Sequence, residues 1–312
     1  MKQTETPKKE GIEQKKHSGV VTIIGRPSAG KSSFLNAVCG GKVSIVSPIP
    51  QTTRKAVRGI ITNDAGQILF LDTPGLHESD KRFNEELRRI TSTAVKESDV
   101  VLYIIDSTRT FGNEEEKIFQ LIQKENLSDR LVIAINKCDE KNSQSGIIFL
   151  TIEKFFPQLQ TSTRVFEISA KQKKGLEALI DALMKLLPYG ELMYPPDFYT
   201  DQDIAFRISE IIREKAIENT REEIPHALYV LIDTLQMKAN GKELFVKAFI
   251  CVERESQKGI VIGKNARVIR AIKEQSLKEL QKIFSYHILL SLQVRVDNDW
   301  RKNSKVVDKL LT

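Results

Sequence analysis

Five short segments of this chain carry residue types that can bind phosphate, a divalent cation and a heterocyclic base. Each follows or flanks a short apolar run, and they occur in the order that a single composite site would need. They are Gly25-Arg26-Pro27-Ser28-Ala29-Gly30-Lys31-Ser32, Thr52-Thr53, Asp72-Thr73-Pro74-Gly75, Asn136-Lys137-Cys138-Asp139 and Ser169-Ala170-Lys171. One of them alone would be weak evidence, but five in register predict a nucleotide site.

The first segment has the chemistry of a phosphate-binding loop. A β-branched run at 20–24 predicts a strand before it, and a helix is expected from residue 31. Backbone N–H groups of such a loop wrap phosphates, Lys31 brings a charge to them, and Ser32 offers its hydroxyl to Mg²⁺. The expected phosphate contacts are Gly25, Ser28, Gly30, Lys31, Ser32 and Ser33. A plain glycine turn with a helix cap would not require Lys-Ser at this offset.

Two further segments are expected to hold the metal and the terminal phosphate. Asp72 ends an apolar strand, where a carboxylate can bind Mg²⁺ through water, and the N–H of Gly75 can meet the γ-phosphate. Thr52 and Thr53 lie in the polar stretch between the two segments. One of these threonines can close over Mg²⁺. We assign Thr53 as the ligand, with Thr52 as the alternative. Lys31, Thr52, Thr53, Asp72 and Gly75 are therefore the predicted catalytic residues.

The last two segments predict guanine as the base. The Asp139 carboxylate can accept hydrogen bonds from the N1–H and the exocyclic amine of guanine, donors that adenine does not present in this arrangement. Asn136 can bond the base edge and tie loops together, and the stem of Lys137 can lie along the ring. Ser169, Ala170 and Lys171 follow a predicted strand at 164–168, and the Ala170 N–H can meet the guanine carbonyl.

The elements that must position these residues alternate between strands and helices. Strands are predicted at 20–24, 56–61, 68–71, 100–105, 131–135 and 164–168, and helices at 31–39, 81–96, 114–124, 145–155 and 175–187. This alternation favours an α/β fold with a doubly wound, mostly parallel sheet that is covered by helices on both faces. Ligands bind at the carboxyl ends of the strands in such sheets.

Length and composition are consistent with two domains of a cytoplasmic protein. The chain has 312 residues, and its three cysteines form no metal or disulfide pattern. No apolar run approaches the about 20 residues of a membrane span. We expect a disordered basic tail at 1–17, a GTP-binding domain at 18–188, a Pro-rich linker at 189–203 and a second domain at 204–312.

The second domain differs in pattern and in charge. Between residues 204 and 312 the chain has 20 Lys and Arg residues against 14 Asp and Glu residues, which is nearly all of the net charge of +7. A helix is predicted at 204–219, and strands at 227–239 and 244–253 are expected to form a hairpin around Asn240-Gly241. A helical segment is predicted at 258–282, a strand at 288–296 and a last helix at 302–311. With Gly263-Lys264-Asn265-Ala266 inside the helical segment, this order resembles a type II KH domain.

In a KH domain the loop between two helices clamps the nucleic-acid backbone. The residues that the resemblance assigns to RNA are Gly263, Lys264, Asn265, Arg267 and Arg270. We expect most of the nearby apolar residues Ile260, Val261, Ile262 and Ile269 to belong to the core.

A GTP-binding domain followed by a KH domain resembles the bacterial Era family of GTPases. The segments that carry the resemblance are 50–54 (PQTTR), 72–77 (DTPGLH), 194–201 (YPPDFYTD), 209–215 (SEIIREK) and 261–265 (VIGKN). The resemblance implies GTP and GDP with Mg²⁺ as ligands, GTP hydrolysis, and binding to the 3′ region of 16S ribosomal RNA during 30S subunit assembly. It also implies a cytoplasmic protein with peripheral contact to the inner membrane, and we expect a monomer.

Three positions depart from the expected patterns. Ser28 stands where this family usually carries an Asn that is associated with a potassium ion, and Ala266 stands where the KH loop usually ends in Gly. Leu76 occupies the position of the water-orienting Gln of Ras-like enzymes, which predicts slow intrinsic hydrolysis. The methyl group of Ala266 predicts weakened RNA binding.

Two other functions fit parts of the sequence. A pure RNA-binding module with a structural nucleotide site would not need intact Lys31, Ser32, Asp72 and Asp139. A membrane-associated signalling GTPase would be expected to carry a strongly amphipathic basic helix with interfacial Trp, and Trp300 is the only tryptophan.

Overall fold

The computed structural model describes residues 15–46, 57–73, 93–159 and 161–311. Thr52, Thr53, Gly75 and Leu76 lie outside the described residues, as do nearly all of the tail and most of the helix predicted at 81–96. Within the described residues, no helix is both long enough and apolar enough to cross a membrane.

The N-terminal half forms one six-stranded sheet with the order β2-β3-β1-β4-β5-β6, in which only the β2–β3 pair is antiparallel. Its strands are β1 (His17–Ile24), β2 (Val57–Asn63), β3 (Gly66–Asp72), β4 (Val100–Asp106), β5 (Leu131–Asn136) and β6 (Val165–Glu167). The central strands β4 and β5 are almost wholly apolar and fully buried, as expected of strands covered on both faces, whereas the edge strand β2 carries exposed polar residues. The prediction of an α/β fold with a mostly parallel sheet is confirmed.

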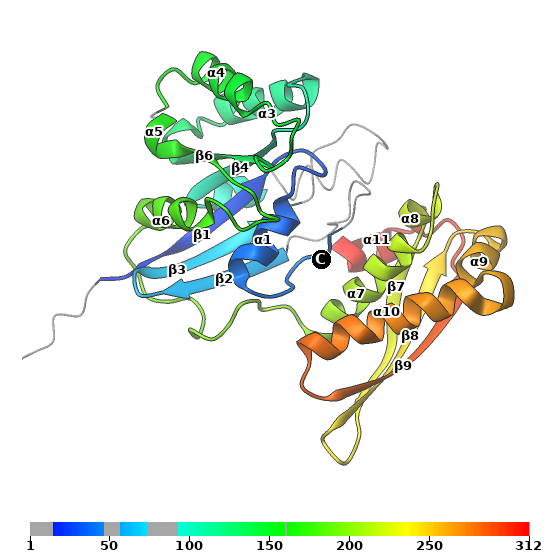
Figure 1. Ribbon diagram of the computed structural model, residues 1–312. Helices are drawn as coiled ribbons and strands as arrows, with labels where there is room; N and C mark the ends of the chain where they lie inside the picture. Colours follow the sequence, from blue (N-terminus) through cyan, green and yellow to red (C-terminus); the bar gives the residue numbers. More distant parts are fainter. Residues whose placement is uncertain (1–14, 47–56, 74–92, 160, 312) are drawn as a thin grey trace, which may run out of the picture.

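Helices cover both faces of this sheet (Figure 1). One core packs α1 (Lys31–Cys39) and α6 (Leu176–Leu186) against the sheet through side chains such as Phe34 and Leu179. The opposite core packs α3 (Asn113–Lys124) and α4 (Ser145–Phe155) through Phe119 and Ile152. These two cores bury the strands whose carboxyl ends carry the predicted site residues Asp72 and Asn136.

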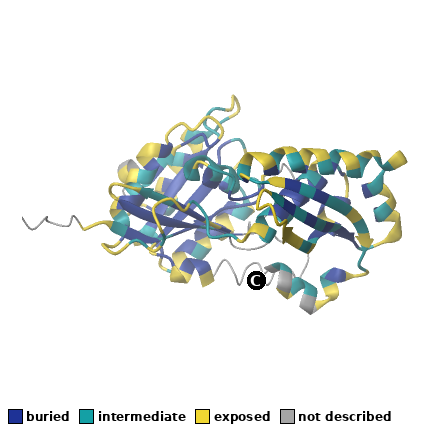
Figure 2. Ribbon diagram, turned by 90° about the horizontal axis from the view of Figure 1, so that it is seen from below, coloured by how far each residue is buried: buried dark blue, intermediate teal, exposed yellow. Residues whose placement is uncertain are grey.

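The C-terminal part forms a separate sheet packed against helices around its own hydrophobic core. Figure 2 shows buried strands in both parts of the molecule. The three strands of the C-terminal sheet have the order β7-β8-β9, antiparallel between β7 and β8 and parallel between β8 and β9. Helices α7, α8, α9 and α10 pack on one face of the sheet, and α11 packs on the other face around Trp300. The elements are α7 (Ile204–Glu218), α8 (Ile224–Ala227), β7 (Tyr229–Met237), β8 (Glu243–Val252), α9 (Glu255–Ile262), α10 (Arg267–Ile283), β9 (His287–Val296) and α11 (Ser304–Leu311).

The structure differs from the predicted elements at several boundaries. The strand predicted at 227–239 is preceded by the short helix α8, which starts with Ile224-Pro225, because Pro is favoured in the first helical turn. The short helix α5 (Thr161–Arg164), which has no apolar periodicity, precedes β6. Two short 3₁₀ turns, Ser128–Arg130 and Trp300–Lys302, were likewise not predicted.

Candidate functional site

The glycine loop between β1 and α1 folds tightly around the Lys31 side chain. The Lys31 ammonium donates to the carbonyl oxygens of Gly25 at 2.9 Å and Arg26 at 3.0 Å. Burial lowers the pKa of Lys31 to about 8, and the nearby Asp72 carboxylate opposes this shift. A phosphate in the loop would offer this ammonium a stronger partner than two neutral carbonyls.

Position 30 requires glycine because of its backbone conformation and because there is no room for a side chain. Gly30 has φ +96°, and a Cβ atom there would lie 2.2 Å from the Asn136 Nδ2 atom. Asn136 occupies this space because its side chain joins two loops: its Nδ2 donates to the Ala29 carbonyl at 2.9 Å, and its Oδ1 accepts from the Ala170 N–H at 3.0 Å. Of the two tasks predicted for Asn136, the structure therefore shows the tying together of loops.

The Ala170 N–H was predicted to meet the guanine carbonyl, but in this structure it donates to Asn136. That prediction requires the hydrogen bond to be shared or released when a base arrives. Ser169 lies beside Asp139, and the hydrogen bond from the Ser169 side chain holds the pKa of the Asp139 carboxyl below its ordinary value. Asp139 is therefore ionised at neutral pH, as an acceptor for two guanine N–H donors must be.

A cavity of about 450 Å³ opens where these loops meet, which is large enough for a nucleoside. It lies at the carboxyl ends of β4 and β5, where Asp106 and Asn136 pair in the sheet register. It is lined by Gly30, Ser33, Thr108, Asn136, Lys137, Asp139, Glu140, Asn142, Ala170 and Lys171. Seven of these ten residues are predicted nucleotide contacts, so the fold brings the separate sequence segments together.

Asp106 is a part of this site that the sequence analysis missed. Its carboxylate lies 2.6 Å from the Lys137 ammonium and accepts from the Thr108 hydroxyl at 2.6 Å. Burial raises the pKa of Asp106, but the hydrogen bonds from Lys137 and Thr108 outweigh burial and the net shift is downward. The ion pair holds the Lys137 ammonium beside Asp106. A polar residue that ends a buried strand, as Asp72 does, was the available signal.

The predicted metal site brings oxygen atoms together at the end of β3. Asp72 is fully buried, and its Oδ2 accepts from the Ser32 hydroxyl at 2.8 Å and from the Ser44 hydroxyl at 3.1 Å. Hydroxyl and carboxylate oxygens are the ligands that Mg²⁺ prefers, so Ser32 and Asp72 fit this ion. Ser44 was not predicted, because a lone Ser in a loop gives no sequence signal. Thr53, the third predicted ligand, lies outside the described residues.

The predicted RNA-binding residues lie together in the second part of the chain, with Gly263, Lys264 and Asn265 in the turn between α9 and α10 and Arg267 and Arg270 at the start of α10. Lys264, Asn265, Arg267 and Arg270 are all exposed. Gly263 has φ +72°, and a Cβ atom there would lie 2.5 Å from a methyl group of Val268, so the turn needs glycine at this position.

The expectation that the neighbouring apolar residues are mostly core is wrong. Val261 is fully buried, but Ile260 is 51% exposed and Ile262 and Ile269 are half-buried. Helix α9 is short and lies at the edge of the domain, so only one of its sides reaches the core. The remaining isoleucines leave apolar surface beside the basic turn.

Comparisons with known proteins agree with this architecture. Residues 20–137 match the family model "50S ribosome-binding GTPase", and residues 223–301 match the model "KH domain". GTPase Era of Treponema denticola is 52% identical over 294 residues, which cover 94% of this chain and 99% of the relative. GTPase Era of Borreliella afzelii is 44% identical over 295 residues, with the same shares covered.

Two solved structures are similar over both domains. A single-residue variant of Era from Aquifex aeolicus, bound to GDP.AlF4-, has a TM-score of 0.88 at 34% identity and covers 95% of this chain and 100% of its own. Era in complex with MgGDPNP and nucleotides 1506–1542 of 16S ribosomal RNA has a TM-score of 0.89, with the same identity and coverage.

Proposed function

Because this chain belongs to the Era family of GTPases, we propose that its KH domain binds 16S ribosomal RNA near the 3′ end and that the protein assists assembly of the small ribosomal subunit. The chain is a GTPase that uses GTP, GDP and Mg²⁺. The proposal concerns what GTP hydrolysis is coupled to. It is supported by the relative solved with nucleotides 1506–1542 of that RNA.

In this proposal the predicted site residues divide into three groups. Lys31, Ser32 and Asp72 hold the phosphates and Mg²⁺, together with Thr52 or Thr53 and with Gly75. Asp139 selects guanine, and Asn136 and Lys137 shape its pocket. The boundaries near residues 188 and 204 separate this machinery from the RNA-binding domain.

The observation that carries the proposal is the exposed basic turn of the KH domain. Lys264 in the turn and Arg267 and Arg270 at the start of α10 are all exposed, and they flank the half-buried isoleucines of α9 and α10. Cations beside apolar surface suit a single strand, which presents phosphates along one side and unstacked bases along the other.

A salt titration of RNA binding tests the proposal with the full chain. The probe is single-stranded RNA of the small-subunit 3′ end. Each phosphate contact should contribute a slope of about −0.7 in log affinity against log salt. Lys264→Glu should weaken binding and flatten the slope by about 0.7, without changing hydrolysis in the absence of RNA. Lys302→Glu is the matched control, because Lys302 is exposed and its ion pair with Asp299 is local.

RNA binding by Lys264→Glu that equals wild type would refute the KH turn as the RNA site. Anionic vesicles in place of RNA test the peripheral membrane contact that the family resemblance implies, and tighter binding to vesicles than to RNA at equal salt would favour a membrane function. To test the assembly role, a bacterium is depleted of its own Era, and its extracts should then contain an excess of small-subunit precursors. Wild type should clear these precursors and Lys264→Glu should not.

A further inference from the structure

The short segment that follows α1 is held from within the GTPase domain by one side chain. Asn36 Oδ1 accepts from the backbone N–H groups of Val43 at 2.8 Å and Ser44 at 2.9 Å, and Asn36 Nδ2 donates to the Ser44 carbonyl at 2.7 Å. Ser44 in turn donates to Asp72 Oδ2. The segment 40–44 is thus tied to the carboxylate of the metal site.

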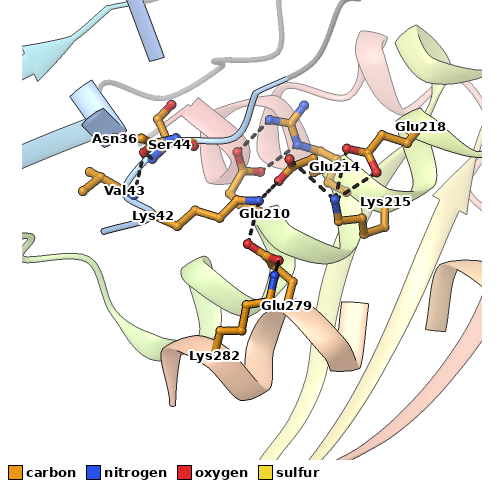
Figure 3. Close-up of polar contacts among 11 residues, drawn as sticks. Asn36, Lys42, Val43, Ser44, Glu210, Glu214, Lys215, Glu218, Glu279 and Lys282 are labelled. Atoms are coloured by element: carbon orange, nitrogen blue, oxygen red, sulfur yellow. Dashed lines mark hydrogen bonds and ion pairs between the residues drawn. The ribbon is translucent and has the colours of Figure 1, made fainter. Parts of the chain in front are cut away.

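The same segment is held by the KH domain from the other side (Figure 3). Lys42 extends away from Ser44, and its ammonium lies 2.5 Å from Glu214 of α7 and 3.5 Å from Glu279 of α10. The linker adds a third contact, since Gln202 Nε2 donates to the Val43 carbonyl at 2.9 Å. One lysine therefore joins two helices of the KH domain to the segment beside Asp72.

The ion pair is too buried to be an ordinary surface contact. The side chains of Lys42 and Glu214 are 17% and 5% exposed. Burial raises the pKa of Glu214, and the hydrogen bond and charge of Lys42 oppose this shift. A buried carboxylate that loses its close cation is destabilised by far more than an exposed one.

Glu214 also belongs to a charged network along α7. Lys215 lies 3.7 Å from Glu214 and 2.9 Å from Glu218, and Arg213 pairs with Glu210 at 2.7 Å. These residues make up most of the segment 209–215, whose pattern the nucleotide site does not use. Within this network Lys215 contacts Glu214: its ammonium lies near Oε1, and Oε2 is left to face Lys42.

We propose that Lys42, held between Glu214 and Glu279, is an interdomain latch through which the KH domain regulates metal and nucleotide binding at Asp72. The inference rests on the nucleotide site and on the interdomain contacts, and it does not depend on RNA being the ligand of the KH domain. The contact of Ser44 with Asp72 determines whether the latch favours or opposes metal binding.

Ser44 and Ser32 both donate to Asp72 Oδ2. The latch acts together with Asn36 to hold Ser44 on this oxygen, where its hydroxyl competes with Mg²⁺ for Oδ2. Weakening the latch should therefore favour the metal-bound site. By reciprocity, Mg²⁺ and nucleotide should weaken the latch by the same factor.

Release of a fluorescent GDP from the full chain tests the proposal. Glu214→Gln keeps the side-chain shape and removes the charge. In Mg²⁺ it should release GDP at least about fivefold more slowly than wild type, the lower end of typical coupling between sites. In EDTA the two proteins should release GDP at the same rate. Glu255→Gln is the matched control, because Glu255 pairs with Lys258 on the exposed side of the same domain.

A readout without nucleotide separates the latch from nucleotide contacts. In the nucleotide-free protein, hydrogen exchange in 40–44 should be faster in Glu214→Gln than in wild type, and unchanged in Glu255→Gln. Lys42→Met carries the same expectations if Glu214→Gln does not fold. Combining Lys42→Glu with Glu214→Lys should restore both measurements toward wild type.

Equal GDP release by wild type and a folded latch variant in Mg²⁺ would overturn the proposal, and so would faster release. A slowing that persists in EDTA would also overturn it, because it would not act through the metal. None of these outcomes depends on RNA, so the latch and the proposed RNA function succeed or fail separately.

Discussion

Asp139 is the residue on which the choice of base depends. Asp139 lines the cavity, and the hydrogen bond from the Ser169 side chain lowers the pKa of its carboxyl. Hydrogen bonds to a charged group contribute about 1.5–3 kcal/mol each. Asp139→Asn should therefore reduce GTP affinity at least about tenfold and raise affinity for XTP, whose C2 carbonyl accepts from an amide.

Competition between unlabelled GTP and XTP for a fluorescent nucleotide measures both affinities. Thr151→Val, at a half-buried position of α4 outside the cavity lining, is a suitable control, because its hydroxyl donates to the Ile147 carbonyl within the helix. Wild-type GTP affinity in Asp139→Asn, with no gain for XTP, would show that another group reads the base.

At the start of α10, two residues other than glycine adopt left-handed backbone angles. Ala266 has φ +58° and ψ +28°, and Asn265 before it is also left-handed. A left-handed L-residue costs about 1–2 kcal/mol, although Asn tolerates this region. Ala266→Gly should thus raise the free energy of unfolding by about 1 kcal/mol and also tighten RNA binding by removing the methyl group.

Urea unfolding of the full chain and the same RNA titration check the two parts of this prediction. Asn265→Gly changes the neighbouring left-handed residue and should gain less stability, because Asn already tolerates the conformation. A loss of stability in Ala266→Gly would show that the turn is not strained at that residue.

Sequence patterns predict an element well where local preference and burial agree. The strand before Asn136 is wholly apolar and fully buried, and its predicted range of 131–135 ends one residue before that of the structure. The pattern could not show that β2 runs antiparallel to β3. That pairing depends on a turn in which Asn63 Oδ1 accepts from the Ala65 and Gly66 N–H groups.

The residues of the candidate site likewise divide into those that the sequence could predict and those that it could not. Lys31, Ser32, Asp72 and Asp139 could be predicted, because each has a fixed offset from the end of an apolar run. Asp106 carries the same signal as Asp72, since it also ends a buried apolar strand, but Ser44 and the Lys42–Glu214 pair could not be predicted. Their roles arise only when segments far apart in sequence are brought together, and isolated charged or hydroxyl residues are most often solvated surface.

At the scale of the whole molecule, the linker is bound to the first sheet rather than free. Gln67 is fully buried; its Nε2 donates to the Tyr194 carbonyl and its Oε1 accepts from the Tyr194 N–H, both at 2.9 Å. The Tyr194 hydroxyl and Arg58 both donate to Asp201. Further along, Ile60 of the edge strand β2 donates its N–H to the Tyr199 carbonyl at 3.0 Å. This attachment determines where the KH domain begins.

Gln67→Met should release the linker, because two backbone groups of Tyr194 lose their partners at about 1–3 kcal/mol each. Limited chymotrypsin digestion should then cut between Tyr194 and Tyr199 faster than in wild type, and small-angle scattering should give a larger radius of gyration. Gln236→Met, on an exposed position of β7, is the matched control. Unchanged cleavage in Gln67→Met would show that other contacts hold the linker.

The parallel pairing of β8 with β9 has a consequence for how the chain folds during synthesis. The ten residues of β8 pair with the ten residues of β9 across the long connection 253–286. Such non-local pairing forms slowly and only after the whole segment has emerged. The first sheet, in contrast, is complete at Glu167. Domains generally fold in N-terminal order on the ribosome, so guanine nucleotide can bind and stabilise the first domain while the second is still being translated.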